Sequence, residues 1–453
     1  MRLFYLRALG FVFLVAFWSL HRQVLGLFGA QGIVPLVDTM ANLRAHFGPG
    51  VPGEGLARVP TVFWWRADDV MLRSVTSVGL AAGAVSLITG WRLALLACWS
   101  SYLSLVVVGR PFLSFQWDAL LLEAGLIAVF WRQGGRIGRW LTLWLLARLV
   151  FWSGVVKLAS GDATWRSLTA LEVHFWTQPL PTWTAWWAHQ LPAGLLSSGC
   201  AAMFAIELLA PLLLIWPATR RLGAAAIVAL MVAISATGNY GFFNLLTVVL
   251  CVVAWDRAPH GAWWREVPAL PLLGVALFMA GTRIDQRLGS SHEVTAELAR
   301  RVGALRSFNG YGLFANMTEE RREIRLEAWD GSAWQPYRFP YKPDAADRRP
   351  AFAGLHMPRL DWQMWFAALG SVERNRWLVS AMDRLVEGSP EVEALFEEVP
   401  LHRPQRVRAV VSDYTFTAVG ESGWWRVSEP LGLYAPIAQG SGNDSSGLPG
   451  SSR

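Results

Sequence analysis

The sequence contains 453 residues, of which 53% are apolar and only 16% are charged, whereas an ordinary soluble domain carries roughly 25% charged residues. This composition excludes an ordinary soluble protein and predicts an integral membrane protein with several spans. The net charge of +7 does not indicate a nucleic-acid partner, because the arginines are dispersed along the chain and follow the alternation of its loops.

Apolar runs of the length that a bilayer requires, about 17–25 residues, recur through the first two thirds of the chain. We predict nine spans, at 3–20, 71–88, 92–109, 113–131, 140–158, 196–216, 222–238, 240–255 and 266–283. Segment 24–36 is too short and too interrupted by glycine to span, so we interpret it as an interfacial or re-entrant piece. The first run has no small-residue cleavage site after it, which indicates a retained anchor. The predicted fold is an α-helical polytopic membrane bundle of about nine spans.

The arginines predict which side of the membrane each loop faces. They gather in alternate short loops, at Arg2, Arg7, Arg92, Arg132, Arg136, Arg139, Arg220, Arg221, Arg257 and Arg265. Arg-rich short loops face the cytoplasm, so the loop 159–195 and everything after about residue 290 are expected outside it. Lys occurs only twice among the 40 basic residues. This bias often accompanies a GC-rich genome, and we expect a bacterial inner-membrane protein.

The character of the sequence changes near residue 289. We divide the chain into a membrane domain over 1–288, an extracytoplasmic α+β domain over 289–438 and a disordered Gly/Ser-rich tail over 439–453. Helical spacing and strand alternation predict the elements of the outer domain. They are a helix at 291–306, a hairpin of strands at 323–329 and 334–339, helices at 360–370 and 374–385, a short segment at 390–398, and strands at 406–419 and 424–427.

Three ionisable side chains fall near the middle of predicted spans: Glu123, Arg148 and Glu207. A charge in the bilayer is costly, so such groups usually pair inside the bundle. We predict that Arg148 contacts Glu123 or Glu207, either in a pair that fixes helix register or in a polar cavity or proton relay. Lys157 lies nine residues after Arg148, on the opposite side of the same helix, and we expect it to snorkel outward.

The outer loop contains the polar segment HFWTQPLP at 174–181, with His174, Thr177 and Gln178. Its two prolines fix φ and stiffen the loop. His174 could act as a base or a ligand, but no second His or Cys lies at metal-ligand spacing, so binding or structural use is favoured over catalysis. Asn239 and Asn244 border a break between two spans, which is either a tight turn or the lining of a cavity shared with the His174 loop.

Six separated segments carry distinctive sequence. They are SLHRQVLGLFGAQGIVP (19–35), GVVKLASGDATWRSLTALEVHFWTQPLP (154–181), IELLAPLLL (206–214), GNYGFFNLLTV (238–248), SFNGYGLFANMTEERREI (307–324) and PRLDWQMWFAAL (358–369). In these segments the chain resembles the lipase maturation factors over nearly its whole length. The resemblance implies a polytopic protein that secreted lipases need to become active. In animals it would lie in the endoplasmic reticulum membrane, with the loop and the C-terminal domain on the lumenal side.

A maturation factor needs surface that contacts its client. The candidate client-binding residues are Asn309, Tyr311, Arg359, Asp361, Trp362 and Trp365. The two tryptophans are anchors for an apolar client if they are exposed and core residues if they are buried. Asp361 lies near the start of its helix, where its carboxylate can cap the helix or interact favourably with the positive end of the helix dipole. The glycines beside Asn309 and Tyr311 also fit simple turns.

Motifs of hydrolases, P-loop NTPases, zinc proteases and dinucleotide-binding enzymes do not occur in the sequence. We therefore expect no cofactor, no metal and no lipase activity of its own. We predict a membrane maturation factor that binds a secreted client protein, with lipases as the expected clients, outside the cytoplasm. The alternatives are a membrane enzyme that acts on a lipid-soluble substrate through an intramembrane polar cavity, and a purely structural subunit. A closed polar cavity joining Glu207, Asn239 and His174 would favour the enzyme.

Overall fold

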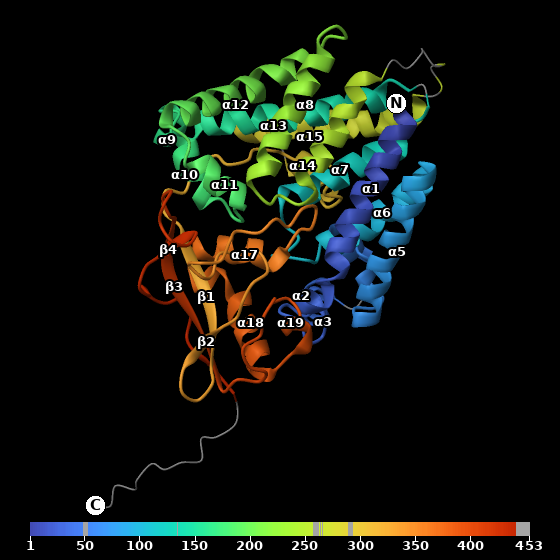
Figure 1. Cartoon of the computed structure of the whole chain (residues 1–453). Coiled ribbons are helices and arrows are strands. Elements are labelled where there is room, and N and C mark those ends of the chain that lie inside the picture. Colours follow the sequence, from blue (N-terminus) through green and yellow to red (C-terminus); the bar gives the residue numbers. More distant parts are fainter. Residues whose placement is uncertain are drawn as a thin grey trace, which may run out of the picture.

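The chain folds into a helical bundle with a sheet-containing domain packed against one end of it (Figure 1). The computed structural model describes residues 1–48, 53–133, 135–256, 262, 264, 266–288 and 293–440, apart from the side chains of 283–288. Most of the predicted disordered tail lies outside the described residues. The described part ends with the short strand β6 (Ala438–Gln439), so regular structure reaches the first residue of the predicted tail.

Five of the described helices are long and apolar enough to cross a membrane. They are α1 (Arg2–His21), α5 (Asp69–Thr89), α8 (Ile137–Ala159), α12 (Ala193–Leu213) and α13 (Arg220–Thr237). The remaining predicted spans coincide with helices that are too short or not apolar enough over a sufficient length. They are α6 (Arg92–Val106), α7 (Gln116–Phe130), α14 (Phe242–Cys251) continued by η2 (Val252–Trp255), and η4 (Val267–Ala269) continued by α15 (Leu270–Leu288). The predicted membrane bundle is confirmed, and the count of nine spans stays a prediction.

Short helices fill the connections of the bundle. They are α2 (Val24–Phe28), α3 (Leu36–Phe47), α4 (Gly53–Arg58), η1 (Val62–Trp64), α9 (Ala163–Arg166), α10 (Ala170–Thr177) and α11 (Trp183–His189). Helix α2 occupies the segment expected to be interfacial or re-entrant. The helices α9 to α11 belong to the predicted outer loop, and Figure 1 shows α10 and α11 between the bundle and the sheet. The N-terminus lies at the end of the bundle away from the sheet.

Small residues bring α1 and α5 into close contact. A Cβ at Gly83 would lie 2.9 Å from the backbone nitrogen of Leu14, and one at Gly79 would overlap the ring of Phe17. Close backbone approach at small residues is a common way for membrane helices to pack. Helix α5 is also capped at its N-terminus, because the Asp68 carboxylate accepts a hydrogen bond from the Met71 amide at 2.9 Å.

The C-terminal domain, which is called the outer domain after its predicted side of the membrane, is built around an antiparallel sheet of order β2-β1-β3-β4, with β5 and β6 also paired with β3. The strands are β1 (Arg322–Trp329), β2 (Trp334–Pro336), β3 (Arg406–Phe416), β4 (Trp425–Val427), β5 (Gly432–Leu433) and β6. In β1 and β3, Ile324 faces Val411 and Leu326 faces Ala409. The predicted hairpin and both alternating strands are confirmed.

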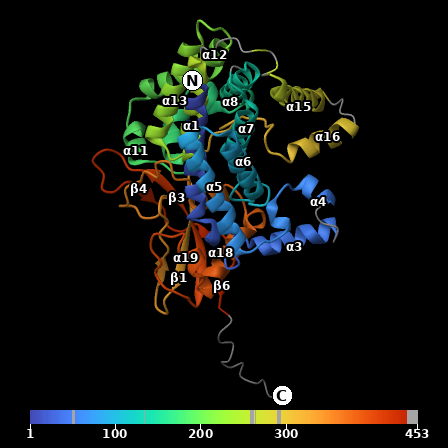
Figure 2. The same cartoon turned by 90° about the vertical axis from the view of Figure 1, so that its right-hand side faces the viewer.

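Helices cover one face of this sheet, as Figure 1 shows. They are α17 (Arg359–Ala368), η5 (Val372–Arg374), α18 (Arg376–Glu387) and α19 (Pro390–Glu393). In α18, Trp377, Leu378, Ala381, Met382 and Leu385 are buried, which is the apolar face of an amphipathic helix. In Figure 2 the helix α16 (Glu293–Gly303), which precedes the sheet, extends with α15 to the side of the bundle.

The outer domain is joined to the bundle by a buried arginine. The Arg359 guanidinium, at the start of α17, donates to both oxygens of Asp118 in α7, at 2.8 and 2.7 Å. The Tyr102 hydroxyl donates to the same carboxylate at 2.6 Å. Arg359 and Asp118 are 1% and 0% exposed, so neither charge is solvated by water. The ion pair is formed only when the outer domain is docked on the bundle.

We expect Asp118→Asn to lower the free energy of unfolding by about 3–5 kcal/mol, because it leaves the Arg359 charge buried without its counter-ion. The double variant Asp118→Leu with Arg359→Met replaces both charges by apolar groups and should recover most of this loss. Thermal unfolding of the detergent-solubilised protein measures both. Glu421→Gln, in an exposed ion pair with Arg426, is the matched control and should change nothing measurable. Equal effects of Asp118→Asn and Glu421→Gln would contradict the assignment.

Candidate functional site

The Arg148 side chain forms an ion pair with Glu123, as the sequence predicts. Its guanidinium also donates to the carbonyl oxygen of Asn309 at 2.9 Å. The second oxygen of Glu123 accepts hydrogen bonds from the Asn309 amide at 3.1 Å and from the Tyr311 hydroxyl at 2.7 Å. The pair therefore binds the segment that leads into the outer domain. Tyr311 is buried, so it is not available at the surface as a client contact.

Lys157 does not snorkel outward, and that expectation was wrong. Its ammonium donates to both carboxylate oxygens of Glu207 in α12, each at 2.7 Å, and the side chain is 3% exposed. The helices can approach because Gly154 has no side chain, and a Cβ there would lie 3.1 Å from the Cβ of Glu207. A carboxylate within reach inside the bundle removes the need for contact with water.

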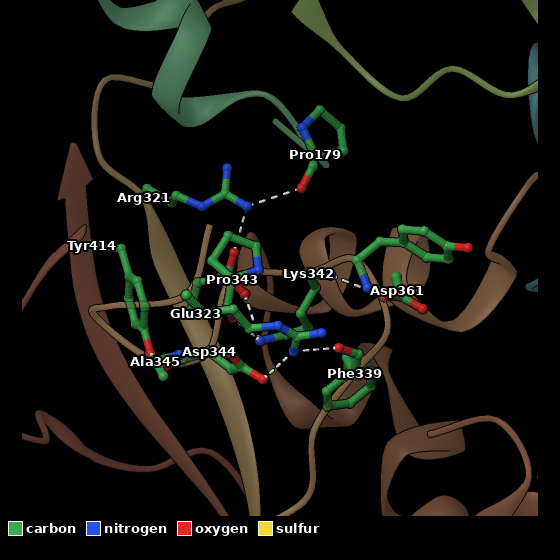
Figure 3. Close-up of polar contacts among 12 residues, drawn as sticks. Pro179, Arg321, Glu323, Phe339, Lys342, Pro343, Asp344, Ala345, Asp361 and Tyr414 are labelled. Carbon is green, nitrogen blue, oxygen red and sulfur yellow. Dashed lines mark hydrogen bonds and ion pairs between the residues drawn. The ribbon is translucent and has the colours of Figure 1, made fainter. Parts of the chain in front are cut away.

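A second buried charge cluster ties the His174 loop to the outer domain (Figure 3). Arg321 donates to the carbonyl oxygens of Trp176, Gln178 and Pro179. Its guanidinium also donates to Glu323 at 2.5 Å, and the Lys342 ammonium lies 2.8 Å from the other oxygen of that carboxylate. Glu323 is only 1% exposed, and it can be buried because two cations neutralise it.

The other polar residues of the loop and the turn bond mainly to the backbone. The Thr177 hydroxyl donates to Val173, and the Gln178 amide donates to Thr237 at 2.8 Å. Asn239 donates to the carbonyl oxygens of Leu180 and Ala351 and accepts from the Ala353 amide at 2.7 Å. The Asn244 amide donates to the Ser235 hydroxyl at 2.8 Å. Asn239 thus fastens a turn to both the loop and the outer domain.

The α17 residues proposed as client contacts are mostly buried. Trp362 and Asp361 are 3% and 2% exposed. The Trp362 indole donates to the carbonyl of Asn239 at 3.0 Å, and that of Trp365 donates to Thr177 at 2.9 Å. The Asp361 carboxylate accepts hydrogen bonds from the amides of Tyr341 and Lys342. The core alternative therefore applies to Trp362, and burial raises the pKa of Asp361 to about 6.

A cavity of about 270 Å³ joins three of the predicted site residues, Lys157, His174 and Glu207. Helices α8, α10, α12 and α13 contribute to its walls, and most of the lining side chains are apolar. Burial, with a smaller contribution from nearby Lys157, lowers the pKa of His174 to about 4. Asn239 lines a different, neighbouring pocket. The cavity is therefore apolar with a polar end, and it is not the closed polar cavity that would have favoured an enzyme.

Sequence reasoning missed several residues that the structure brings together. Asp118, Arg321, Glu323 and Lys342 were not singled out as site residues. One signal was present in the composition. The chain has only two lysines, and each is buried against a glutamate.

Two family models match the chain in the order of its two structural parts. The lipase maturation factor transmembrane domain matches residues 1–260, and the lipase maturation factor C-terminal domain matches residues 307–434. The chain belongs to the lipase maturation factor family. The unmatched residues between the two models include α15 and α16, which lie at the side of the bundle.

Individual members of the family are similar over most of their length. Lipase maturation factor 2 from Homo sapiens is 33% identical, and the alignment covers 94% of this chain and 81% of that protein. Lipase maturation factor 1 from Bos taurus is 29% identical, with 96% and 88% covered. No solved structure matches the chain. The apolar helices and the family together establish an integral membrane protein.

The sites of this family member contain buried ion pairs but no metal-ligand cluster. In the part of the chain that the structure describes, no three His, Cys, Asp or Glu side chains are grouped to hold a metal ion. The three cysteines are buried and free. What the arrangement offers chemically is a set of neutralised charges at the junction of two domains and one half-buried imidazole, that of His174, facing an apolar cavity.

We expect acid to destabilise the protein through His174 and His356, because burial lowers the pKa of each from 6.5 to about 4. Between pH 4 and pH 6.5 these histidines bind protons in the unfolded chain but not in the folded protein. The free energy of unfolding is therefore highest above pH 6.5 and decreases as the pH falls towards 4. Each histidine accounts for about 3 kcal/mol. His174→Phe should reduce the loss by that amount when the free energy of unfolding is measured at both pH values. Identical pH slopes for the wild type and His174→Phe would contradict this.

Proposed function

We propose that the protein is a membrane-bound maturation or folding factor for secreted proteins, with lipases as clients. The observation that carries the proposal is the similarity of nearly the whole chain to proteins named lipase maturation factor 1 and 2. Both the bundle and the outer domain take part in the match. The mechanism would be chaperone-like, in which the outer domain binds and shields apolar surface of the client while it folds.

The client-binding surface has to be sought away from the buried residues. Phe366 in α17 and Leu369, the residue that caps the C-terminal end of that helix, are 40% and 49% exposed, and they lie three residues apart, on one side of the helix. They replace Trp362 as the candidate apolar anchors. The domain that carries them is held rigidly by the Arg359–Asp118 pair, which supports presentation of a fixed surface to a partner.

When a host that lacks a maturation factor expresses a lipase encoded in the same genome as this chain, we expect the secreted lipase to be inactive. Co-expression of this chain should make the secreted lipase active. The measurement is lipase activity divided by the mass of secreted lipase, which separates folding from synthesis. The double variant Phe366→Ser with Leu369→Ser should lower this specific activity. Val419→Ser, at an exposed valine outside α17, is the control. Equal specific activity with and without the chain would exclude lipases as clients.

We further propose that the outer domain lies outside the cytoplasm of a bacterial inner membrane, or in the lumen of the endoplasmic reticulum in a eukaryotic host. The arginine distribution supports this orientation. The N-terminus and the outer domain lie at opposite ends of the bundle (Figure 1), as an odd number of spans requires.

The orientation can be tested with reporters fused after residue 440. We expect alkaline phosphatase, which is active only after export, to be active there, and green fluorescent protein, which folds in the cytosol, to be dark. The same reporters fused after residue 133, in a predicted cytoplasmic loop, should give the reverse. A fluorescent, phosphatase-negative fusion at residue 440 would end both the orientation and the client proposal.

The second candidate function is a membrane enzyme that acts on a lipid-soluble substrate. The cavity beside Lys157, Glu207 and His174 is the observation that favours it. Its apolar walls suit such a substrate, but the one carboxylate and the one ammonium are bound to each other. We therefore rank the maturation factor first.

A further inference from the structure

The cavity beside His174 has the size and the lining of a ligand site. It measures about 270 Å³, close to the lower end of typical ligand pockets at roughly 300 Å³. Its lining includes the apolar side chains of Leu230, Met231 and Phe243. It also includes Lys157, Glu207 and His174, which lie near one another and are called the polar end below. An apolar space with a few polar groups gathered at one end suits an amphiphilic molecule.

The polar end carries no net charge. Lys157 and Glu207 neutralise each other through two hydrogen bonds of 2.7 Å, and the lysine also lies 5.4 Å from the ring centre of Trp165. With a pKa of about 4, the His174 imidazole is neutral at physiological pH. A charged ligand group would find no free counter-ion among these three residues, and burying it would be costly.

The imidazole of His174 is available to a ligand. Its ring makes edge contacts with Phe175 and Phe314. In the described part of the chain neither of its nitrogens has a hydrogen-bond partner, although the neutral ring has one donor and one acceptor. The ring is half-buried, and His174 belongs to the cavity lining. A ligand in the cavity with a hydroxyl or ester group could therefore hydrogen-bond to the imidazole.

Partly exposed lining residues indicate that the cavity opens between two helices that are long enough to cross the membrane. Its lining includes Gly199 and Met203 from α12, and Ile234 and Thr237 from α13, which are all half-buried, whereas Ala233 is exposed. Both helices are candidate membrane spans. An opening between such helices faces the acyl chains of the bilayer, so a lipid can enter without crossing water.

We propose that this cavity binds a single-chain lipid with an uncharged polar head, a long-chain alcohol or monoester, whose head hydrogen-bonds to His174 while its chain lies along α13. The inference does not depend on the lipase proposal. It assigns the Lys157–Glu207 pair a positioning role, because the pair keeps the polar end of the cavity neutral.

The test uses the purified full chain in lipid nanodiscs with a dodecanol that carries a diazirine in its chain. After illumination, mass spectrometry should find the label on cavity residues such as Ser153 and Met203. Unlabelled dodecanol should compete with it at pH 7.5, and dodecanoate should compete at least tenfold less well. His174→Phe keeps the wall apolar but removes the hydrogen bond, and should weaken labelling roughly three- to tenfold.

Two variants of α13 provide a matched pair. Ala233→Trp places an indole in the mouth and should reduce labelling at least tenfold, whereas Ala229→Trp, one turn earlier and also exposed but outside the lining, should have no effect. Labelling spread over the lipid-facing surface, or insensitive to Ala233→Trp, would mean surface lipid only and would overturn the proposal. Equal competition by dodecanoate would overturn the uncharged head. The competition arms use the wild type, so they decide the matter even if a variant fails to fold.

Discussion

The buried ion pair between Arg359 and Asp118 is the contact on which the rest of the architecture depends. Its two charges come from the outer domain and the bundle, and each would be strongly disfavoured alone in an apolar environment. The Glu123–Arg148 pair repeats the principle on the segment that leads into the outer domain. Charges that are neutralised only across a junction make the docked arrangement much more stable than a separated one.

The same logic organises the outer loop. Arg321 donates hydrogen bonds to three carbonyl oxygens of the loop. Its charge is neutralised by Glu323, which also forms an ion pair with Lys342. This cluster, with Asn239 and the indoles of α17, holds the end of α10 and the turn at Asn239 against the outer domain. The position of His174 at the cavity wall is thus a consequence of contacts made by three segments that are distant in sequence.

Much of the fold could be predicted because its signals are local. The apolar runs marked the helices of the bundle, and alternation marked β1 and β3 with nearly correct bounds. The prediction of an Arg148–Glu123 contact succeeded because an intramembrane charge has few possible partners. Lys157 was placed wrongly because snorkelling and internal pairing suit the same sequence, and only the approach of α12 at Gly154 separates them.

The sequence alone determined the membrane class, the division into bundle and outer domain, and the family. These depend on composition, on local periodicity and on short sequence segments that can be recognised without a structure. Only the tertiary structure decided which polar residues pair with other residues inside the protein and which face a cavity. That depends on the distance between side chains on different elements, such as Lys157 with Glu207 or Arg359 with Asp118, and no local pattern encodes such a distance.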